Sequence, residues 1–389
     1  MKSRNSRANS GYVGQNRLSD DYGVISENKN YLRSNLTQWI RPANWLPLPS
    51  MTAGDQMFAG LLAVYPGDPA LTGPTASGNF VAFSVTGCTY TVDWGNGTTQ
   101  SYSAGATAQY NFDFGSISAA TTITGVEGLS GYRQTVITAY PTVAGTTFSG
   151  INLSAKYFES GVFFDNYLGT NWAPTWLDMR IAGSDISSFK FNTPFNNRIK
   201  QFEWVGNSGI TNGVGLFSSA KKIKSFIGTS WTSNIIDFAN MFSSCTSLET
   251  IPLLNTANGL TFHSMFANCS SLETIPLLDT SKGKNIQSMF QSCSSLQTIP
   301  LLDFRAVTTA GTSIFPNCSN LKQAATQWAA APSVPLSFDG CNLSPRALDQ
   351  IFTNLPTVTG SKICNVSNNW GSPLCNRSIA QNKGWTVVP

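Results

Sequence analysis

The sequence has little of the chemistry that enzymes use: it contains one histidine, and charged residues make up only 11% of its 389 positions. A histidine base needs a partner that orients its ring. His263 lies in one of the internal repeats described below, and the neighbouring repeats have Ala239 and Gln287 at the same position. The position therefore tolerates different side chains. We therefore exclude Ser-His-Asp and Cys-His catalysis and expect His263 to be exposed.

Several site and targeting motifs are also missing. No Cys-x-x-Cys pair occurs for zinc or redox chemistry, and no Gly-x-x-x-x-Gly-Lys-Ser/Thr loop occurs for phosphate. No window approaches the ~18 apolar residues of a membrane helix, and residues 1–10 lack the apolar core of a secretion signal. We therefore expect no cofactor, no metal, no membrane insertion, and synthesis in a cytosol.

The net charge of +4 originates in residues 1–41, which contain seven basic and three acidic residues, while the rest of the chain balances at 17 of each. Without a basic stripe in the body, we expect no nucleic-acid binding. Residues 1–50 are interpreted as an arm rich in Ser, Asn, Arg and Gly, followed by a Trp- and Pro-rich strap. Such an arm is either a free terminus or a segment that orders against a neighbouring subunit.

Residues 51–145 show the alternation of a β-sandwich. Apolar residues recur at every second position in residues 80–85 and 89–94, and Tyr110, Phe112 and Phe114 continue this period. Residues 135–139 supply a closing strand, and Gly95-Asn96-Gly97 marks a hairpin turn. The segment YTVDWGNGT resembles the signature of PKD-like (Ig-like) β-sandwich domains, with Asn96 where the family usually has Asp.

Internal repetition dominates residues 146–340. Met241-Phe242, Met265-Phe266, Met289-Phe290 and Ile314-Phe315 recur at spacings of 24, 24 and 25 residues, and a cysteine follows each pair in step. A period near 24 predicts a mainly β solenoid of leucine-rich-repeat size, whose coils must stack to bury their apolar columns. Less regular copies begin upstream, at Leu216-Phe217 and at Trp176.

The consensus MFxxCxSLxTIPLLDTS resembles the bacterial surface-antigen type of leucine-rich repeat, in a variant found in phage and mycoplasma proteins. Residues 341–389 also resemble the ending of such phage proteins and are predicted to cap the solenoid. Ser344 is a candidate N-cap and Pro345 a first helical residue. An amphipathic set should then bury its apolar side, namely Ala347, Leu348, Ile351 and Phe352.

Cysteines and carboxylates in the repeats have structural interpretations. One cysteine per coil favours a column of buried thiols over disulfides, and only Cys364 and Cys375 remain as a pair to test. Asp279 and Asp303 align with Asn255, which indicates a turn position. Two identical carboxylates one coil apart are also a poor acid and base pair for glycoside cleavage.

Surface contact is the remaining kind of site. Glu249, Glu273 and Gln297 fall in register and predict a polar row on the solenoid, which is either a binding surface or only a solvated face. Four tryptophans occur where the repeats are irregular and where function often resides, namely Trp172, Trp176, Trp204 and Trp231.

The resemblances favour a non-enzymatic structural protein of a phage virion, made in the host cytoplasm and exposed on the particle as a tail fibre, baseplate or capsid decoration component. Its expected partners are other virion proteins, contacted through the arm and sandwich, and a host-surface receptor or glycan; we also expect a homo-oligomer or a lattice-associated protein. Two alternatives remain: a surface adhesin or binding module, and a tailspike-like polysaccharide-degrading enzyme.

Overall fold

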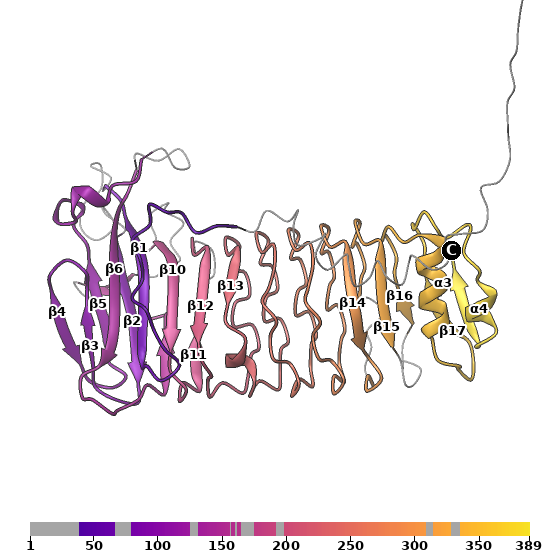
Figure 1. Cartoon of the computed structure of the whole chain (residues 1–389), viewed down its shortest axis with the longest axis horizontal. Helices are drawn as coiled ribbons and strands as arrows, with labels where there is room; N and C mark the ends of the chain where they lie inside the picture. The colour runs from indigo at the N-terminus through magenta and orange to yellow at the C-terminus, as the bar shows by residue number, and fades with distance from the viewer. Residues whose placement is uncertain are drawn as a thin grey trace, which may run out of the picture. The chain divides into compact units, whose positions relative to one another are not determined.

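The computed structural model describes residues 39–66, 79–124, 131–155, 157–159, 162–164, 175–191, 198–308, 314–327 and 335–389. Residues 41–389 form one unit, which is mainly β and contains a β-solenoid of about eight turns (Figure 1). Within the predicted arm and strap of residues 1–50, residues 1–38 lie outside the described residues, as does Trp172.

The first part of this unit consists of short strands in two packed sheets. The strands are β1 (Met57–Val64), β2 (Phe80–Thr86), β3 (Tyr90–Asp93), β4 (Thr99–Tyr102), β5 (Thr107–Asn111), β6 (Arg133–Pro141) and β7 (Gly150–Asn152). The order β1-β6-β3-β4 belongs to one sheet and β7-β2-β5 to the other. A short hairpin of β8 (Tyr157–Glu159) and β9 (Val162–Phe164) follows. The strands predicted at 80–85, 89–94 and 135–139 are thus confirmed.

Two residues of the expected strand, Phe112 and Phe114, lie beyond its observed end. β5 ends at Asn111, and Phe114 begins a 3-10 helix, η1 (Phe114–Ser116), which is followed by η2 (Ala119–Thr121). Asp113 breaks the alternation because its side chain accepts a hydrogen bond from the Gly115 amide and caps η1. The prediction that the strand extends through Phe114 is therefore wrong.

Aromatic rings from the two sheets fill the space between them. The ring centroids of Phe83 on β2 and Phe58 on β1 lie 5.3 Å apart, and Trp94 lies 6.0 Å from Phe83. All three side chains are fully buried. The turn after β3 is tight: Gly95 has a φ of 73°, and a Cβ there would collide with the Val136 carbonyl, so glycine is required. The alternation seen in the sequence is thus the inward face of these sheets.

Both sheets continue into the solenoid without a break. β10 (Thr175–Ala182) pairs antiparallel with β1 on one side and parallel with β12 (Gln201–Val205) on the other. β13 (Ser225–Ile227) then adds to β12, and β11 (Ser188–Lys190) adds to β7 in the second sheet. The first coils of the solenoid therefore share backbone hydrogen bonds and core with the sandwich.

The strap before β1 is fastened across this junction. Gln134 on β6 accepts from the Leu46 amide at 2.9 Å and donates to the Asn44 carbonyl at 2.9 Å. Arg41 forms an ion pair of 2.6 Å with Asp178 on β10, whose side chain is only 2% exposed. Burial raises the pKa of Asp178, and the Arg41 guanidinium opposes that rise.

Because the pKa of Asp178 is raised in the folded state, the fold loses stability as the pH rises above about 4, the ordinary pKa of an aspartate. Arg41 limits this loss. We expect Arg41→Ala to lower the free energy of unfolding by about 2 kcal/mol at pH 7, and by less near pH 4, where Asp178 takes up a proton. Urea denaturation at the two pH values measures this.

Arg305→Ala is the matched control, because Arg305 pairs with Asp303 at 2.6 Å on the surface. This variant should leave unfolding unchanged within error. An equal loss from both variants would contradict the special role of the buried pair.

Regular coils follow β13. They include η3 (Ser230–Thr232) and later strands β14 (Thr298–Asp303), β15 (Gln323–Gln327), β16 (Leu336–Ser337), β17 (Lys362–Asn365) and β18 (Trp385–Val388). Single parallel bridges link Asn212 to Asp237, Asp237 to Thr261, and Thr261 to Asn285. Backbone amides donate directly to the next coil, as from Phe242 to the Met265 carbonyl at 2.9 Å. The internal repetition is therefore a stack of equivalent coils.

Phenylalanine rings form a continuous column inside the coils. Successive centroids lie between 5.5 and 5.7 Å apart, and the planes of the rings at 242 and 266 differ by only 2°. The column comprises Phe217, Phe242, Phe266, Phe290, Phe315 and Phe338. A second stack joins Phe238 and Phe262 at 5.4 Å. Each ring is buried by contact with rings of the neighbouring coils, so no coil is stable alone.

Small polar residues turn the backbone on either side of each Phe. Asn240, Ser264 and Ser288 have φ values between 52 and 55°, and a second position four residues later, as in Ser244 and Asn268, also has positive φ. Asn adopts this left-handed region readily, whereas β-branched residues are strained there. The positive φ at these positions explains why Asn or Ser, and no β-branched residue, stands there.

The repeated cysteines form the predicted column of buried thiols. The Sγ atoms of Cys245, Cys269 and Cys293 donate to the carbonyls of Phe217, Phe242 and Phe266 in the preceding coil, at 3.0 to 3.1 Å. Cys318 and Cys341 make the same contact. Burial raises the pKa of the Cys245 thiol to about 12.

The pKa of the Cys245 thiol is higher in the folded state than in the unfolded state, where it is about 8.5. Its contribution to stability is therefore complete below pH 8.5 and is lost as the pH rises toward the pKa of the folded state, with the unfolded value of about 8.5 marking the onset. Cys245→Ala should therefore make the decline of unfolding free energy between pH 9 and 10 shallower by about 1 kcal/mol per pH unit. Met265→Leu, which removes no titrating group, should leave this slope unchanged. Denaturation at a series of pH values tests both.

The predicted C-terminal helix is present as α3 (Pro345–Asn354). Ser344 accepts from the Ala347 amide as the N-cap, Pro345 is the first helical residue, and the predicted apolar set is buried. β17, a short helix α4 (Ser378–Gln381) and β18 follow α3, and β16-β17-β18 form a parallel sheet. The coil pattern thus continues past α3 to the last strand.

Candidate functional site

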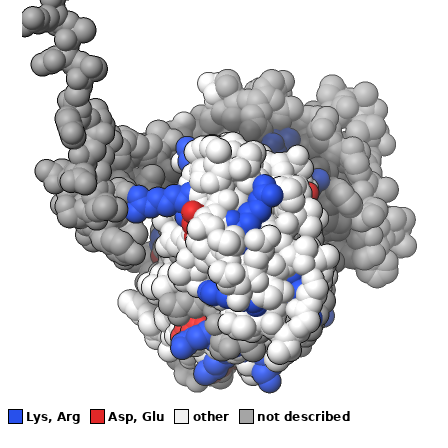
Figure 2. Space-filling model, turned by 90° about the vertical axis from the view of Figure 1, so that its right-hand side faces the viewer, with Lys and Arg blue, Asp and Glu red and all other residues white. Residues whose placement is uncertain are grey.

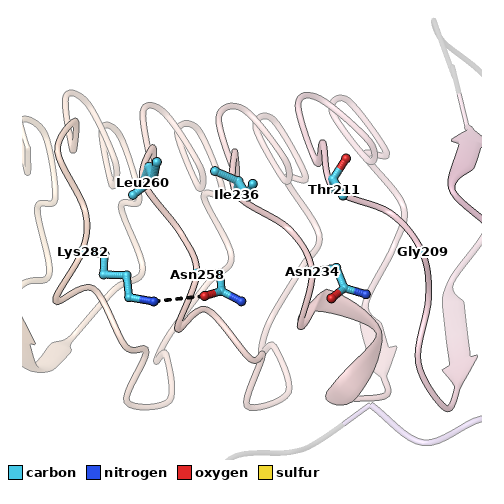
Figure 3. Close-up of a pocket in the computed structure, with 7 residues that line it drawn as sticks. All are labelled: Gly209, Thr211, Asn234, Ile236, Asn258, Leu260 and Lys282. Carbon is cyan, nitrogen blue, oxygen red and sulfur yellow. Dashed lines mark hydrogen bonds between the residues drawn. The ribbon is translucent and has the colours of Figure 1, made fainter.

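A groove of about 410 Å³ runs across neighbouring coils of the solenoid. Its walls come from the same position of successive coils, as Figure 3 shows. The lining residues are Gly209, Thr211, Asn234, Ile236, Asn258, Leu260 and Lys282. The groove is therefore a product of the stacking.

One wall of the groove is a polar row. Asn258 donates to the Ser233 carbonyl at 3.0 Å and accepts from the Lys282 ammonium at 3.0 Å. Asn234 donates to the Ser208 carbonyl at 2.7 Å. These amides bridge coils and are fixed in position, and the exposed Lys282 places a positive charge at the end of the row.

The opposite wall is largely apolar. Ile236 is 45% exposed, and Leu260 and Thr211 lie beside it along the stack (Figure 3). Lys282 is the sole ionisable residue of the lining. A groove with one apolar wall, one amide wall and no pair of titratable groups suits binding of an extended segment, and it lacks the two partners that acid-base chemistry requires.

The predicted polar row lies on a different part of the coils. Backbone amides of Glu273 and Gln297 donate to the carbonyls of Glu249 and Glu273, so the three residues stack in register. All three are half-buried. Glu249 also pairs with Lys224 at 2.9 Å, which leaves Glu273 and Gln297 as the more open part of the row.

An apolar row that sequence reasoning missed lies on the same strand-like run. Leu253 is 57% exposed, Leu277 56% and Leu301 46%. Their neighbours Ile251 and Leu254 are buried, so the leucine between them faces solvent in each coil. The Ile-Pro-Leu-Leu repeat held this signal, because the isoleucine and the second leucine are needed for the core and the first leucine is left facing outward.

The carboxylates considered for glycoside cleavage serve turns, as the alignment indicated. Asp279 accepts from the Ser281 amide and Asp303 from the Arg305 amide, both at 3.0 Å, and Asn255 makes the same contact with Ala257. Hydrogen bonding from Ser281 lowers the pKa of Asp279, and hydrogen bonding from Arg305 lowers that of Asp303. Both carboxyls are thus ionised at neutral pH, whereas a general acid requires a raised pKa.

His263 is half-buried and bound to its own solenoid. Its Nδ1 lies 3.1 Å from the Gln287 carbonyl oxygen, and its Nε2 lies 3.4 Å from the Ser264 hydroxyl. Neither contact supplies the carboxylate that would orient a catalytic imidazole. The ring therefore adds a coil-to-coil contact.

The tryptophans in the irregular coils are core residues. Trp176 is 8% exposed, Trp204 1% and Trp231 0%. Trp204 and Trp231 stack with centroids 5.4 Å apart. Irregularity in the sequence there reflects larger rings in the core near the sandwich.

Metal, disulfide and membrane features are absent from the described ranges. No group of three or more His, Cys, Asp or Glu side chains is placed there to hold a metal ion. Cys364 and Cys375 are free thiols, and Cys375 donates to the Ser372 carbonyl at 3.2 Å. No helix of these ranges has the length and hydropathy needed to cross a membrane.

The solenoid is similar to one known family. Residues 211–328 match the family described as "Mycoplasma protein of unknown function, DUF285". This segment contains the groove apart from Gly209, the phenylalanine column from Phe217 to Phe315, and both surface rows. A comparison with curated proteins finds no match.

His263→Ala should change the free energy of unfolding by less than about 0.5 kcal/mol, because its position in the coil tolerates different side chains. Phe262→Ala, one residue earlier, should cost about 3–5 kcal/mol because it empties a fully buried site in a ring stack. Urea denaturation of both variants distinguishes a tolerant repeat position from a required one, and a large loss at His263 would contradict this assignment.

Proposed function

We propose that this chain is a non-enzymatic structural protein of a phage virion, exposed on the particle, and that its solenoid contacts other proteins or the host surface. One observation supports the non-enzymatic contact role: the stacked coils present continuous surface rows, while the groups that resemble catalytic residues are engaged in structural contacts. Asp279, Asp303 and His263 bind neighbouring backbone or side chains of the same solenoid.

The surface rows support contact with a macromolecule. The exposed leucines at 253, 277 and 301 repeat at coil spacing, as do the walls of the groove. Rows of this kind match extended partners, and apolar rows on a protein surface commonly mark interaction sites. The virion assignment itself rests on the resemblance of the repeats and of residues 341–389 to phage proteins.

We also assign the two parts of the fold to families. The signature YTVDWGNGT lies on β3 and its following turn, with Trp94 in the core, which supports a PKD-like sandwich. The coils of about 24 residues, each with one strand-like run and an apolar column, support leucine-rich repeats.

The virion proposal is tested on particles of the phage that encodes the chain. Mass spectrometry of gradient-purified virions should find this protein at a stoichiometry set by the particle, and antibody labelling in the electron microscope should place it on head or tail. Purified virions without the chain would contradict the proposal. Release of shortened glycans by the purified protein would instead favour the tailspike-like enzyme.

The leucine row provides a second test. Leu277→Glu should reduce incorporation of the chain into particles, or host attachment, without loss of stability, because Leu277 is mostly exposed. Val214→Glu is the matched control: Val214 is 46% exposed but lies at another position of its coil. Complementation of a phage lacking the chain measures both variants, and equal behaviour would show that the row makes no contact.

A further inference from the structure

Among the described residues, the C-terminal layer of the solenoid is packed against other coils on one side only. Residues 366–381 pack on α3: the Asn376 amide donates to Asp349 at 2.6 Å, and the Gly371 amide donates to the Leu343 carbonyl at 3.0 Å. Beyond this layer, β18 is an edge strand, since among the described residues it pairs only with β17. Two large apolar side chains in this layer face solvent: Trp370 is 58% exposed and Leu374 is 74% exposed.

The backbone that presents these side chains is fixed. Asn369, only 4% exposed, donates to the carbonyls of Phe338 and Val366 and accepts from the Leu343 amide. On the other side of Trp370, Gly371 lies so close to the Ser344–Pro345 backbone that a Cβ would collide with it. The backbone therefore holds Trp370 in an exposed position. Binding of a partner at Trp370 then costs little backbone entropy.

The C-terminal residues carry an excess of positive charge. Residues 341–389 contain four basic residues against the single acid Asp349. The basic residues are Arg346, Lys362, Arg377 and Lys383. Figure 2, which views the molecule from this end, shows more Lys and Arg than Asp and Glu on a mostly uncharged surface. Tryptophan and arginine are enriched among the residues that contribute most of the binding energy in protein interfaces.

The chain itself contains one region of opposite charge. Residues 42–150 have a single basic residue, Arg133, against five acidic ones. Their sheet also ends in an edge strand, β4, and Asp93 on β3 is paired with Thr99 of β4 in the ladder. The arm, with six basic and three acidic residues in 1–38, has the same sign as the C-terminal layer.

We propose that the C-terminal surface, formed by Trp370, Leu374 and β18, docks on the β4 edge of a second copy of this chain. Charge selects this occupant, because contact with the arm or with another C-terminal surface would bring like charges together. Among the described residues, both members of the contact are edge strands of their sheets, and natural proteins generally cover such edges. The two surfaces differ, so the contact is heterologous and builds open head-to-tail chains. This inference does not depend on location in a virion.

Sedimentation velocity of the full chain over a range of concentrations tests the proposal. We expect sizes that grow past the dimer with concentration and shrink with added salt. Trp370→Ser combined with Leu374→Ser should weaken self-association by about tenfold or more, and circular dichroism should confirm an unchanged fold because both side chains are exposed. A chain that stays monomeric up to millimolar concentration would overturn the proposal.

Mixing experiments establish the polarity of the contact. The double variant retains its β4 edge, so it should bind wild-type chains and stop their growth. If the double variant fails to bind wild type, and wild type forms only dimers, the contact joins two C-terminal surfaces and the proposal is overturned. Thr99→Lys should weaken association because it adds a cation opposite Asp93, whereas the matched Thr99→Glu should not. Equal effects of these two variants would also overturn it.

Discussion

Stacking of each coil on the next is the interaction on which this structure depends. The phenylalanine column places each inner ring between two equivalent rings, with centroids no more than 5.7 Å apart, and the thiol of each coil donates to the carbonyl of the Phe before it. Neither contact exists within a single coil. The spacing of the repeats, the left-handed Asn and Ser residues and the buried cysteines all follow from keeping successive coils in register.

The sequence predicted these stacked features well because they repeat. A column is visible as a residue type that recurs every 24 or 25 positions, and the turn role of Asp279 is visible from Asn255 one coil earlier. The helix at 345–354 was also predictable, since its cap, its proline and its apolar face are all local. The strand limit at Asn111 was less accessible: alternation continued to Phe114, but the capping side chain of Asp113 ended it.

Features that join distant segments were not predictable from the repeat pattern. β1 is central to the first sheet because β6 and β10 pair with its two edges, yet its sequence is an apolar run with no clear period. The ion pair of Arg41 and Asp178 joins residues 137 apart, and nothing local identifies either as a partner. The exposed leucines were hidden for another reason: apolar residues in an apolar repeat are assigned to the core by default.

A structure built by adding coils has a particular difficulty at its ends, because the last coil exposes what every other coil buries. On the sandwich side this is resolved by β10, which joins the coils to β1. On the other side, α3 and α4 replace the irregular turns of the inner coils and extend the same hydrophobic core, while Trp370 and the edge of β18 stay uncovered by the described residues. The layer that presents Trp370 is as firmly hydrogen-bonded as the inner coils, so the exposure belongs to an ordered surface. An ordered apolar surface beside an open strand edge is unfavourable in water and becomes favourable once a complementary surface covers it.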